Sequence, residues 1–154
     1  MNIEARLVQL EIELPPVTPP AGLYRAAARV GELVFMSGAG PARPDGTWVT
    51  GKVGADVSEA EARDAARLTG LQLLAGLRRE IRSLDNVVSV VKILGMVNCA
   101  AGFNRTPMVI DGCSELFLDV FGEAGRSARS AVGMAELPFD ICVEIEAVFA
   151  VTPR

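Results

Sequence analysis

The run from Val87 to Val97 is the feature that most constrains the fold of this chain of 154 residues. Valine and isoleucine dominate the run, their branched side chains favour strands, and Lys92 is its only charged residue. A strand with one solvated face would alternate apolar and polar residues, and this run does not. The sequence therefore predicts a strand inside a sheet, with other strands beside it.

Two segments with helical spacing flank this strand. The first begins at a capping box, Ser58 to Glu61, in which the two side chains bond free backbone amides, and it ends near Asp85. The second runs from Val109 to Phe121. Further strands are predicted at 26–30 and 33–36, joined tightly at Gly31, and at 128–137 and 141–151. This order predicts an α/β (α+β) domain, with one sheet and both long helices on one face.

Residues 1–20 are predicted to form an arm outside the main domain, which spans 21–154. The arm opens with apolar residues on one stripe of a short helix: Ile3, Leu7, Leu10 and Leu14. Prolines then exclude both helix and central strand: Pro15, Pro16, Pro19 and Pro20. We expect the arm to be an appendage that the fold does not need.

Composition excludes several kinds of chemistry. The chain has no histidine, so Ser-His-Asp and Cys-His sites are ruled out within one chain, and a zinc-activated water is disfavoured. Cys99, Cys113 and Cys142 form no CxxC pair and are expected to be reduced, mostly buried thiols in a cytoplasmic protein. A net charge of -4 disfavours nucleic acid, and no run of residues is long and apolar enough for a signal peptide or a membrane span.

Apolar residues make up 50% of the chain, and many of them are small. One domain of this size has a limited interior, so burial between identical subunits is one outlet for apolar surface and an alanine-rich core is the other.

Glu144 and Glu146 lie two apart on a predicted strand, so they project to the same side while Val143 and Ile145 point into the core. Such a pair is either a solvated strand face or part of a site. Arg126 and Arg129 precede them at what the spacing suggests is a hairpin partner, where either could lie close to them. Arg129 is the candidate of the two for binding a ligand, and its guanidinium has the planar geometry that binds a carboxylate.

Four segments turn these scattered residues into a pattern: Leu33-Val34-Phe35-Met36-Ser37-Gly38, Ala128-Arg129-Ser130-Ala131-Val132, Glu136-Leu137-Pro138 and Val143-Glu144-Ile145-Glu146-Ala147. In this order and spacing they resemble the YjgF/RidA family of reactive-intermediate deaminases. The resemblance runs from about Tyr24 to Val151.

The resemblance implies a chorismate-mutase-like fold with a mixed sheet, and a homotrimer with a central barrel and a ligand cleft at each subunit interface. It assigns Arg129 to the substrate carboxylate and Glu144 to the attacking water, with Tyr24, Ser37 and the main chain of Ala131 lining the cleft. It implies no cofactor and no metal. The reaction would convert 2-imino or 2-enamino acids to 2-keto acids and ammonia.

This sequence departs from the family pattern at several positions. The usual Gly-Pro-Tyr-Ser segment reads Gly22-Leu23-Tyr24-Arg25, and Ala131 replaces a common cysteine. Besides the deaminase, two other functions stay open: a non-catalytic trimer that binds small carboxylates or regulates, and an endoribonuclease, which the acidic charge and the lack of histidine disfavour.

Overall fold

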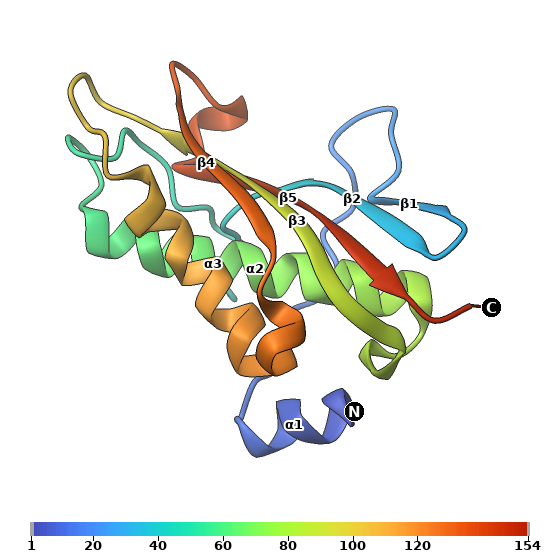
Figure 1. Ribbon diagram of the computed structural model, residues 1–154. Coiled ribbons are helices and arrows are strands. Elements are labelled where there is room, and N and C mark those ends of the chain that lie inside the picture. Colours follow the sequence, from blue (N-terminus) through green and yellow to red (C-terminus); the bar gives the residue numbers. More distant parts are fainter. Residues whose placement is uncertain (1, 154) are drawn as a thin grey trace.

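The computed structural model describes residues 2–153, so Met1 and Arg154, which open the predicted arm and close the predicted domain, lie outside it. Figure 1 shows its elements along the chain. The α-helices are α1 (Ile3–Gln9), α2 (Glu59–Ile81) and α3 (Thr106–Phe121). The strands are β1 (Ala27–Val30), β2 (Leu33–Ala39), β3 (Val87–Asn98), β4 (Ala128–Met134) and β5 (Val143–Val151). Short 3-10 turns are η1 (Leu84–Asn86), η2 (Gly122–Gly125) and η3 (Pro138–Asp140).

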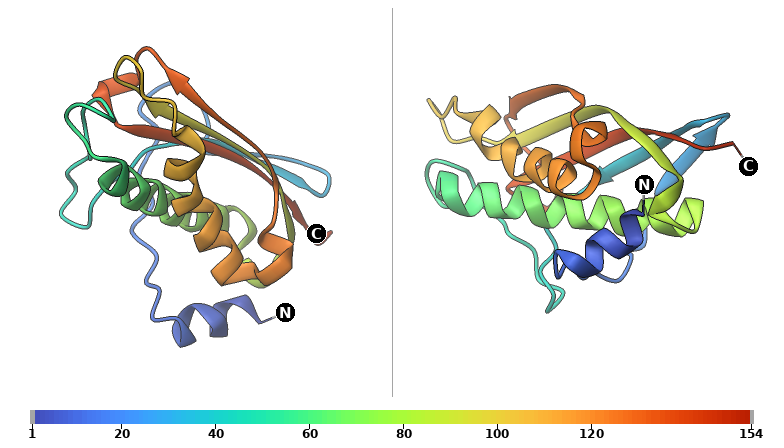
Figure 2. Two further views of the ribbon diagram at one scale, coloured as in Figure 1. Left: turned by 60° about the vertical axis from the view of Figure 1, so that its left-hand side comes forward. Right: turned by 60° about the horizontal axis from the view of Figure 1, so that its bottom comes forward.

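The strands form a mixed five-stranded sheet in the order β1-β2-β5-β3-β4. Only β3 and β4 are parallel among these neighbours, because α3 carries the chain back between them. Helices α2 and α3 lie together on one face of the sheet (Figures 1 and 2). The α+β architecture and the interior position of the Val87–Val97 strand are thus confirmed.

The predicted ends of the two long helices, α2 and α3, lie within a few residues of the observed ends. Ser58 Oγ accepts from the Glu61 amide at 3.2 Å and Glu61 accepts from the Ser58 amide at 2.8 Å, which completes the capping box at the start of α2. Helix α3 begins three residues before the predicted Val109, with Pro107 in its first turn. Proline is tolerated there because the first amides of a helix have no partner within it.

The core lies between the sheet and the two long helices. Val143, Ile145 and Phe149 of β5 are fully buried, and the Phe149 ring packs edge-to-face on Phe117 with 5.6 Å between the ring centroids. Strand alternation therefore places Glu144 and Glu146 on the opposite face of the sheet.

The face of the sheet away from α2 and α3 carries apolar side chains that nothing in residues 2–153 covers. Leu33 and Phe35 of β2 are 37% and 44% exposed, and Val132 of β4 is 39% exposed. Leu33 and Phe35 alternate with buried Val34 and Met36, so their exposure follows from the pleat of the strand. Part of the apolar content of the sequence thus forms an exposed patch on this face of the sheet.

Helix α1 is shorter than its apolar stripe predicts, because it ends at Gln9 instead of Leu14. The chain turns at Glu11, whose φ is 55°, and Leu10 is 39% exposed. The helix packs on the body of the molecule, below α3 in Figure 1, with Ile3 and Leu7 buried in the main core. The Asp85 carboxylate accepts from the amides of Ile3 and Glu4 at 2.5 and 3.1 Å. The boundary at residue 20 stays a prediction, and the contacts of α1 tie the arm to the domain.

These contacts give a direct test of the arm. Ile3→Val should lower the free energy of unfolding by about 0.5–1.5 kcal/mol, because it removes one methylene from a tightly packed position. Urea unfolding measures the change. Val8→Ala on the same helix is the matched control, since Val8 is 79% exposed. Equal stability of the two variants would mean that α1 does not pack on the domain in solution.

Candidate active-site cleft

A cleft of about 860 Å³ opens between the proline segment of the arm, α2 and the ends of β2 and β5. Three of the predicted site residues line it: Tyr24, Ser37 and Glu144. Its walls are otherwise mostly apolar and include Met36, Trp48, Leu73, Phe139 and Ile141. The cleft therefore combines a small polar patch with a large apolar surface, which is the usual composition of a small-molecule site.

Glu144 lies at the polar end of this cleft, close against the main chain at Gly38. A Cβ atom at position 38 would come within 2.9 Å of the Glu144 carboxyl carbon, so the glycine leaves room for this carboxylate in the position that it occupies. Burial raises the pKa of Glu144, and the nearby charge of Glu146 raises it further. Within residues 2–153 no side chain or amide donates a hydrogen bond to Glu144. This carboxylate is therefore half-buried, unpaired and directed at a cleft.

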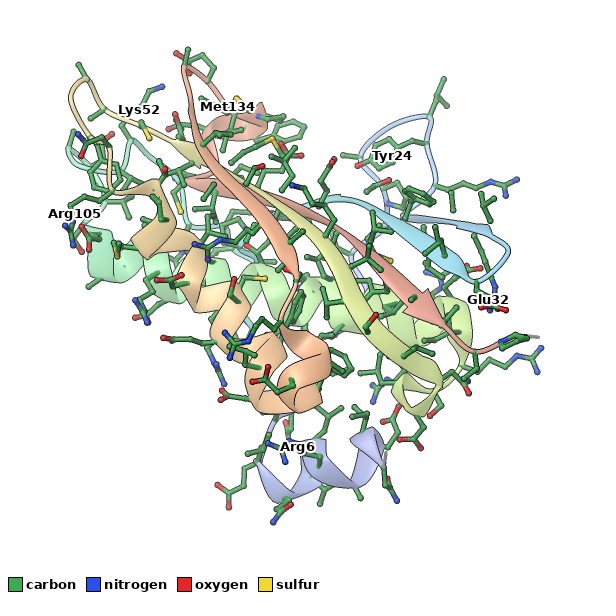
Figure 3. All side chains as sticks on the ribbon, in the orientation of Figure 1. Arg6, Tyr24, Glu32, Lys52, Arg105 and Met134 are labelled. Carbon is green, nitrogen blue, oxygen red and sulfur yellow. The ribbon has the colours of Figure 1, made fainter. Side chains whose placement is uncertain are left out.

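Ser37 and Tyr24 are held by the loop that precedes β1. Ser37 Oγ donates to the Arg25 carbonyl at 2.6 Å, and Tyr24 Oη accepts from the Ala21 amide at 3.2 Å. Tyr24 stays half exposed on this loop, which Figure 3 shows beside the end of the sheet. These contacts fold the loop against β2 and form one side of the cleft.

Arg129 lies elsewhere, on the outer strand β4. Its Nη1 donates to Asp111 Oδ1 at 2.7 Å and to Ser114 Oγ at 3.0 Å, both on α3. Its Nη2 makes only a long contact of 3.5 Å to the Pro107 carbonyl. Ala131 is on the same strand, where its carbonyl accepts from Thr106 Oγ1 at 3.0 Å.

The expected hairpin between the last two strands is wrong. Strand β3 lies between β4 and β5, and Arg129 is paired with Ile93 on the helix-covered face of the sheet. Glu144 is paired with Met96 and points to the other face. Arg129 and Glu144 of one chain therefore do not meet.

Arg25 and Arg126 also lie away from Glu144. Arg25 lines a second cleft of about 830 Å³, which also contains Arg29 and Arg79. Arg126 forms a bidentate pair with Glu123 at 3.0 and 2.9 Å, which lowers the pKa of Glu123. The additional charge at position 25 therefore belongs to the neighbouring cleft.

Sequence reasoning missed Trp48 and Phe139, which form the aromatic wall of the first cleft. Trp48 belongs to the long loop between β2 and α2, for which the sequence predicts at most a short strand. In the structure it forms an isolated bridge to Ala42. The signal that could have found it is the glycine at position 40, where a Cβ would come within 2.7 Å of the Trp48 ring.

The three thiols are separate from the cleft. Cys113 and Cys142 are fully buried, and burial raises their pKa to about 12 and about 11. Cys99 is partly exposed, and burial raises its pKa as well. Buried neutral thiols are poor nucleophiles, so the expectation of mostly buried cysteines is confirmed.

Residues 2–153 offer neither a metal site nor a membrane-spanning helix. No group of three or more Cys, Asp or Glu side chains is placed to hold a metal ion. None of the described helices has the length and apolar character needed to span a membrane.

The chain is similar to known proteins over almost its whole length. Residues 4–150 match the family described as "YjgF/chorismate_mutase-like, putative endoribonuclease". Protein TCP17 of Trypanosoma cruzi is 38% identical over 148 residues, covering 96% of this chain and 92% of TCP17. A 2-iminobutanoate/2-iminopropanoate deaminase of Dermatophagoides farinae is 30% identical over 141 residues, covering 91% of this chain and 94% of that protein.

Among solved structures, one from Shewanella oneidensis, described as a "putative endoribonuclease", has a TM-score of 0.93 at 29% identity. The match covers 98% of this chain and 100% of that one. The family match itself begins at residue 4, within α1.

Proposed function

Because this chain belongs to the YjgF/RidA family, with its chorismate-mutase-like fold, we propose that it hydrolyses reactive 2-imino and 2-enamino acids to 2-keto acids and ammonia. The observation that carries the proposal is Glu144, a half-buried carboxylate with a raised pKa and no hydrogen-bond donor of its own in residues 2–153. A catalytic base is most effective when its pKa is closer to the working pH than that of an ordinary glutamate. The cytoplasmic location expected from the reduced thiols belongs to the same proposal.

The chemistry needs one base and one water molecule. The imine reacts in its N-protonated form. Ionised Glu144 accepts a proton from the water as the water oxygen bonds to the imine carbon, and the C=N electron pair moves to nitrogen, which becomes a neutral amine. In the second step the amine nitrogen takes that proton from Glu144 and leaves as ammonia, while the carbinol oxygen gives its proton to the Glu144 carboxylate, which releases it to solvent, and becomes the keto group. An enamine first takes a proton at carbon to become the imine. Imines react readily, so positioning and charge provide enough acceleration.

The substrate carboxylate needs a cation, and we propose that Arg129 of a neighbouring copy supplies it. The position of Arg129 on the outer strand supports this, as does its Nη2 atom, which has only one long contact among residues 2–153. The exposed apolar face of the sheet supports association of copies into the homotrimer that the family resemblance implies.

This association is testable on the sheet face. Light scattering should give about three chain masses for the parent protein and about one for Phe35→Glu, because a charge would be buried without a partner in the contact. Val8→Glu is the control, since Val8 is 79% exposed on α1. A parent protein that is monomeric would exclude the shared cleft.

The raised pKa of Glu144 also predicts a pH effect. Hydrolysis should fall on the acid side as Glu144 gains its proton, at a pH above the range of an ordinary glutamate. Glu146→Gln removes one cause of the raised pKa, so the acid limb of kcat/KM should move to lower pH. Glu11→Gln is the control, because Glu11 is exposed and is not among the residues that line the cleft. The same imine is used with every variant, so the titration of the imine contributes equally to all of the pH profiles. An acid limb that stays in place would assign it to another group.

The activity itself is tested by generating 2-aminoacrylate in the assay with an amino-acid dehydratase and following ammonia and 2-keto acid with and without the protein. We expect both products to appear faster with the protein. Product release at the uncatalysed rate would favour the carboxylate-binding alternative. Cleavage of RNA in a parallel assay would favour the endoribonuclease, which the net charge of -4 disfavours.

A further inference from the structure

We propose that Trp48 and Phe139 select a substrate with an aromatic side chain, an inference that rests on the proposed function of the same cleft. The cleft of about 860 Å³ is at the upper end of the range that binds drug-sized ligands. A three-carbon imino acid would leave most of it empty. The polar side chains of the lining include Glu144 and Ser37, and Thr18 bonded to Gln72, and the rest of the wall, which is mostly apolar, faces whatever the substrate carries beyond its imino and carboxylate groups.

Trp48 lies next to the reacting position. The glycines at 38 and 40 are two residues apart. At each of them, neighbouring side chains occupy the space that a side chain of its own would need. A Cβ at Gly38 would meet Glu144, and a Cβ at Gly40 would come within 2.7 Å of the Trp48 ring and 3.1 Å of the Ile141 side chain. The main chain of Trp48 is fixed by Arg43, whose Nη1 donates to the Trp48 carbonyl at 2.9 Å. The indole is therefore held beside the base by the same segment.

Phe139 lies on η3 and is 81% exposed. Its φ of 56° and the φ of 57° at Asp140 lie in the left-handed region, where two consecutive residues other than glycine are uncommon. Asn98 Nδ2 donates to the Asp140 side chain at 3.0 Å, and the Gly51 amide donates to the main-chain carbonyl of Asp140 at 2.8 Å. These two hydrogen bonds hold the turn in this conformation. A strained turn that presents a large aromatic ring to a cleft is a feature typical of ligand sites.

These observations favour an aromatic ligand over an acidic one. Arg43 donates to the Trp48 carbonyl but is not among the residues that line this cleft, and the wall around Trp48 is made of apolar and aromatic side chains. An aromatic ring gains both apolar burial and edge-to-face or stacked contact from such a wall. The imines of aromatic 2-keto acids, such as that of phenylpyruvate, are the substrates that match both ends of the cleft.

Trp48 is the only tryptophan in the chain, so its fluorescence reports directly on this wall. The probes are 3-phenylpropanoate, propanoate and succinate, added to the full-length protein and checked by calorimetry. We expect 3-phenylpropanoate to change the Trp48 emission and to bind at least about tenfold more tightly than propanoate. Phe139→Ala should remove most of this preference. Leu23→Ala is the matched control, because Leu23 is fully exposed and is not among the residues that line the cleft.

The kinetic test compares two imines. Phe139→Ala should lower the ratio of kcat/KM for the phenylpyruvate imine over 2-aminoacrylate by about tenfold. If the parent binds 3-phenylpropanoate no more tightly than propanoate, or prefers succinate, the inference is overturned even when 2-aminoacrylate is hydrolysed. If no imine is hydrolysed but 3-phenylpropanoate still binds at Trp48, the proposed function fails and the aromatic pocket stands. The comparison of probes needs only the parent protein, so it holds even if the variant does not fold.

Discussion

Glu144→Gln should slow imine hydrolysis by a factor on the order of 100 or more while 2-keto acids still bind. Glutamine keeps the shape that fits against Gly38, but it cannot accept a proton from water at neutral pH. Turnover of 2-aminoacrylate measures the loss, and calorimetry with pyruvate measures binding.

The matched control for this substitution is Glu146→Gln, two residues along the same face of β5. It should keep turnover near the parental rate at neutral pH. If Glu144→Gln hydrolyses imines as fast as the parent, Glu144 is not the base and the pair is a solvated strand face.

Arg129→Lys should weaken binding of 2-keto acids by about 1.5–3 kcal/mol, because lysine keeps the charge but loses the planar, two-pronged geometry. The pair with Asp111 gives Arg129 a structural role as well, since it links β4 to α3. Urea unfolding separates the two roles. Asp111→Asn is the control: it weakens the same link but should leave ligand affinity largely unchanged. Parental affinity for pyruvate in Arg129→Lys would leave only the structural role.

The two impaired variants, Glu144→Gln and Arg129→Lys, also test whether Glu144 of one copy meets Arg129 of another. Refolding Glu144→Gln and Arg129→Lys chains together gives mixed trimers in which about a quarter of the interfaces combine an intact Arg129 with an intact Glu144. Activity should return to about that fraction. If one chain supplied both residues, mixing would restore nothing.

Much of the fold could be predicted from local signals. The valine-rich run, the capping box at Ser58 and the prolines of the arm each act within a few residues, so their consequences are visible in the sequence. The alternation around Glu144 likewise places it on the correct face, and the family pattern selected it from many other carboxylates.

Strand order was the part that local signals do not encode. The segments 128–134 and 143–151 follow each other closely in sequence and look like a hairpin, yet β5 pairs with β2 and β3. The backbone N–H and C=O groups along both edges of a buried strand need partners, and the sequence of the strand does not say which strands supply them. For the same reason the aromatic wall was missed. Trp48 and Phe139 are brought to one cleft by long-range contacts, and nothing within either loop indicates the other.

The central position of β5 has a consequence for biosynthesis. The ribosome delivers β5 after the other four strands of this sheet, so β2 and β3 are complete well before the strand that joins them exists. Until residues 143–151 emerge, the nascent chain exposes two unpaired edges, which are templates for pairing with other chains. A premature stop just before this segment would remove the middle of the sheet instead of trimming its border, leaving two disconnected ribbons that a cell must degrade or shield.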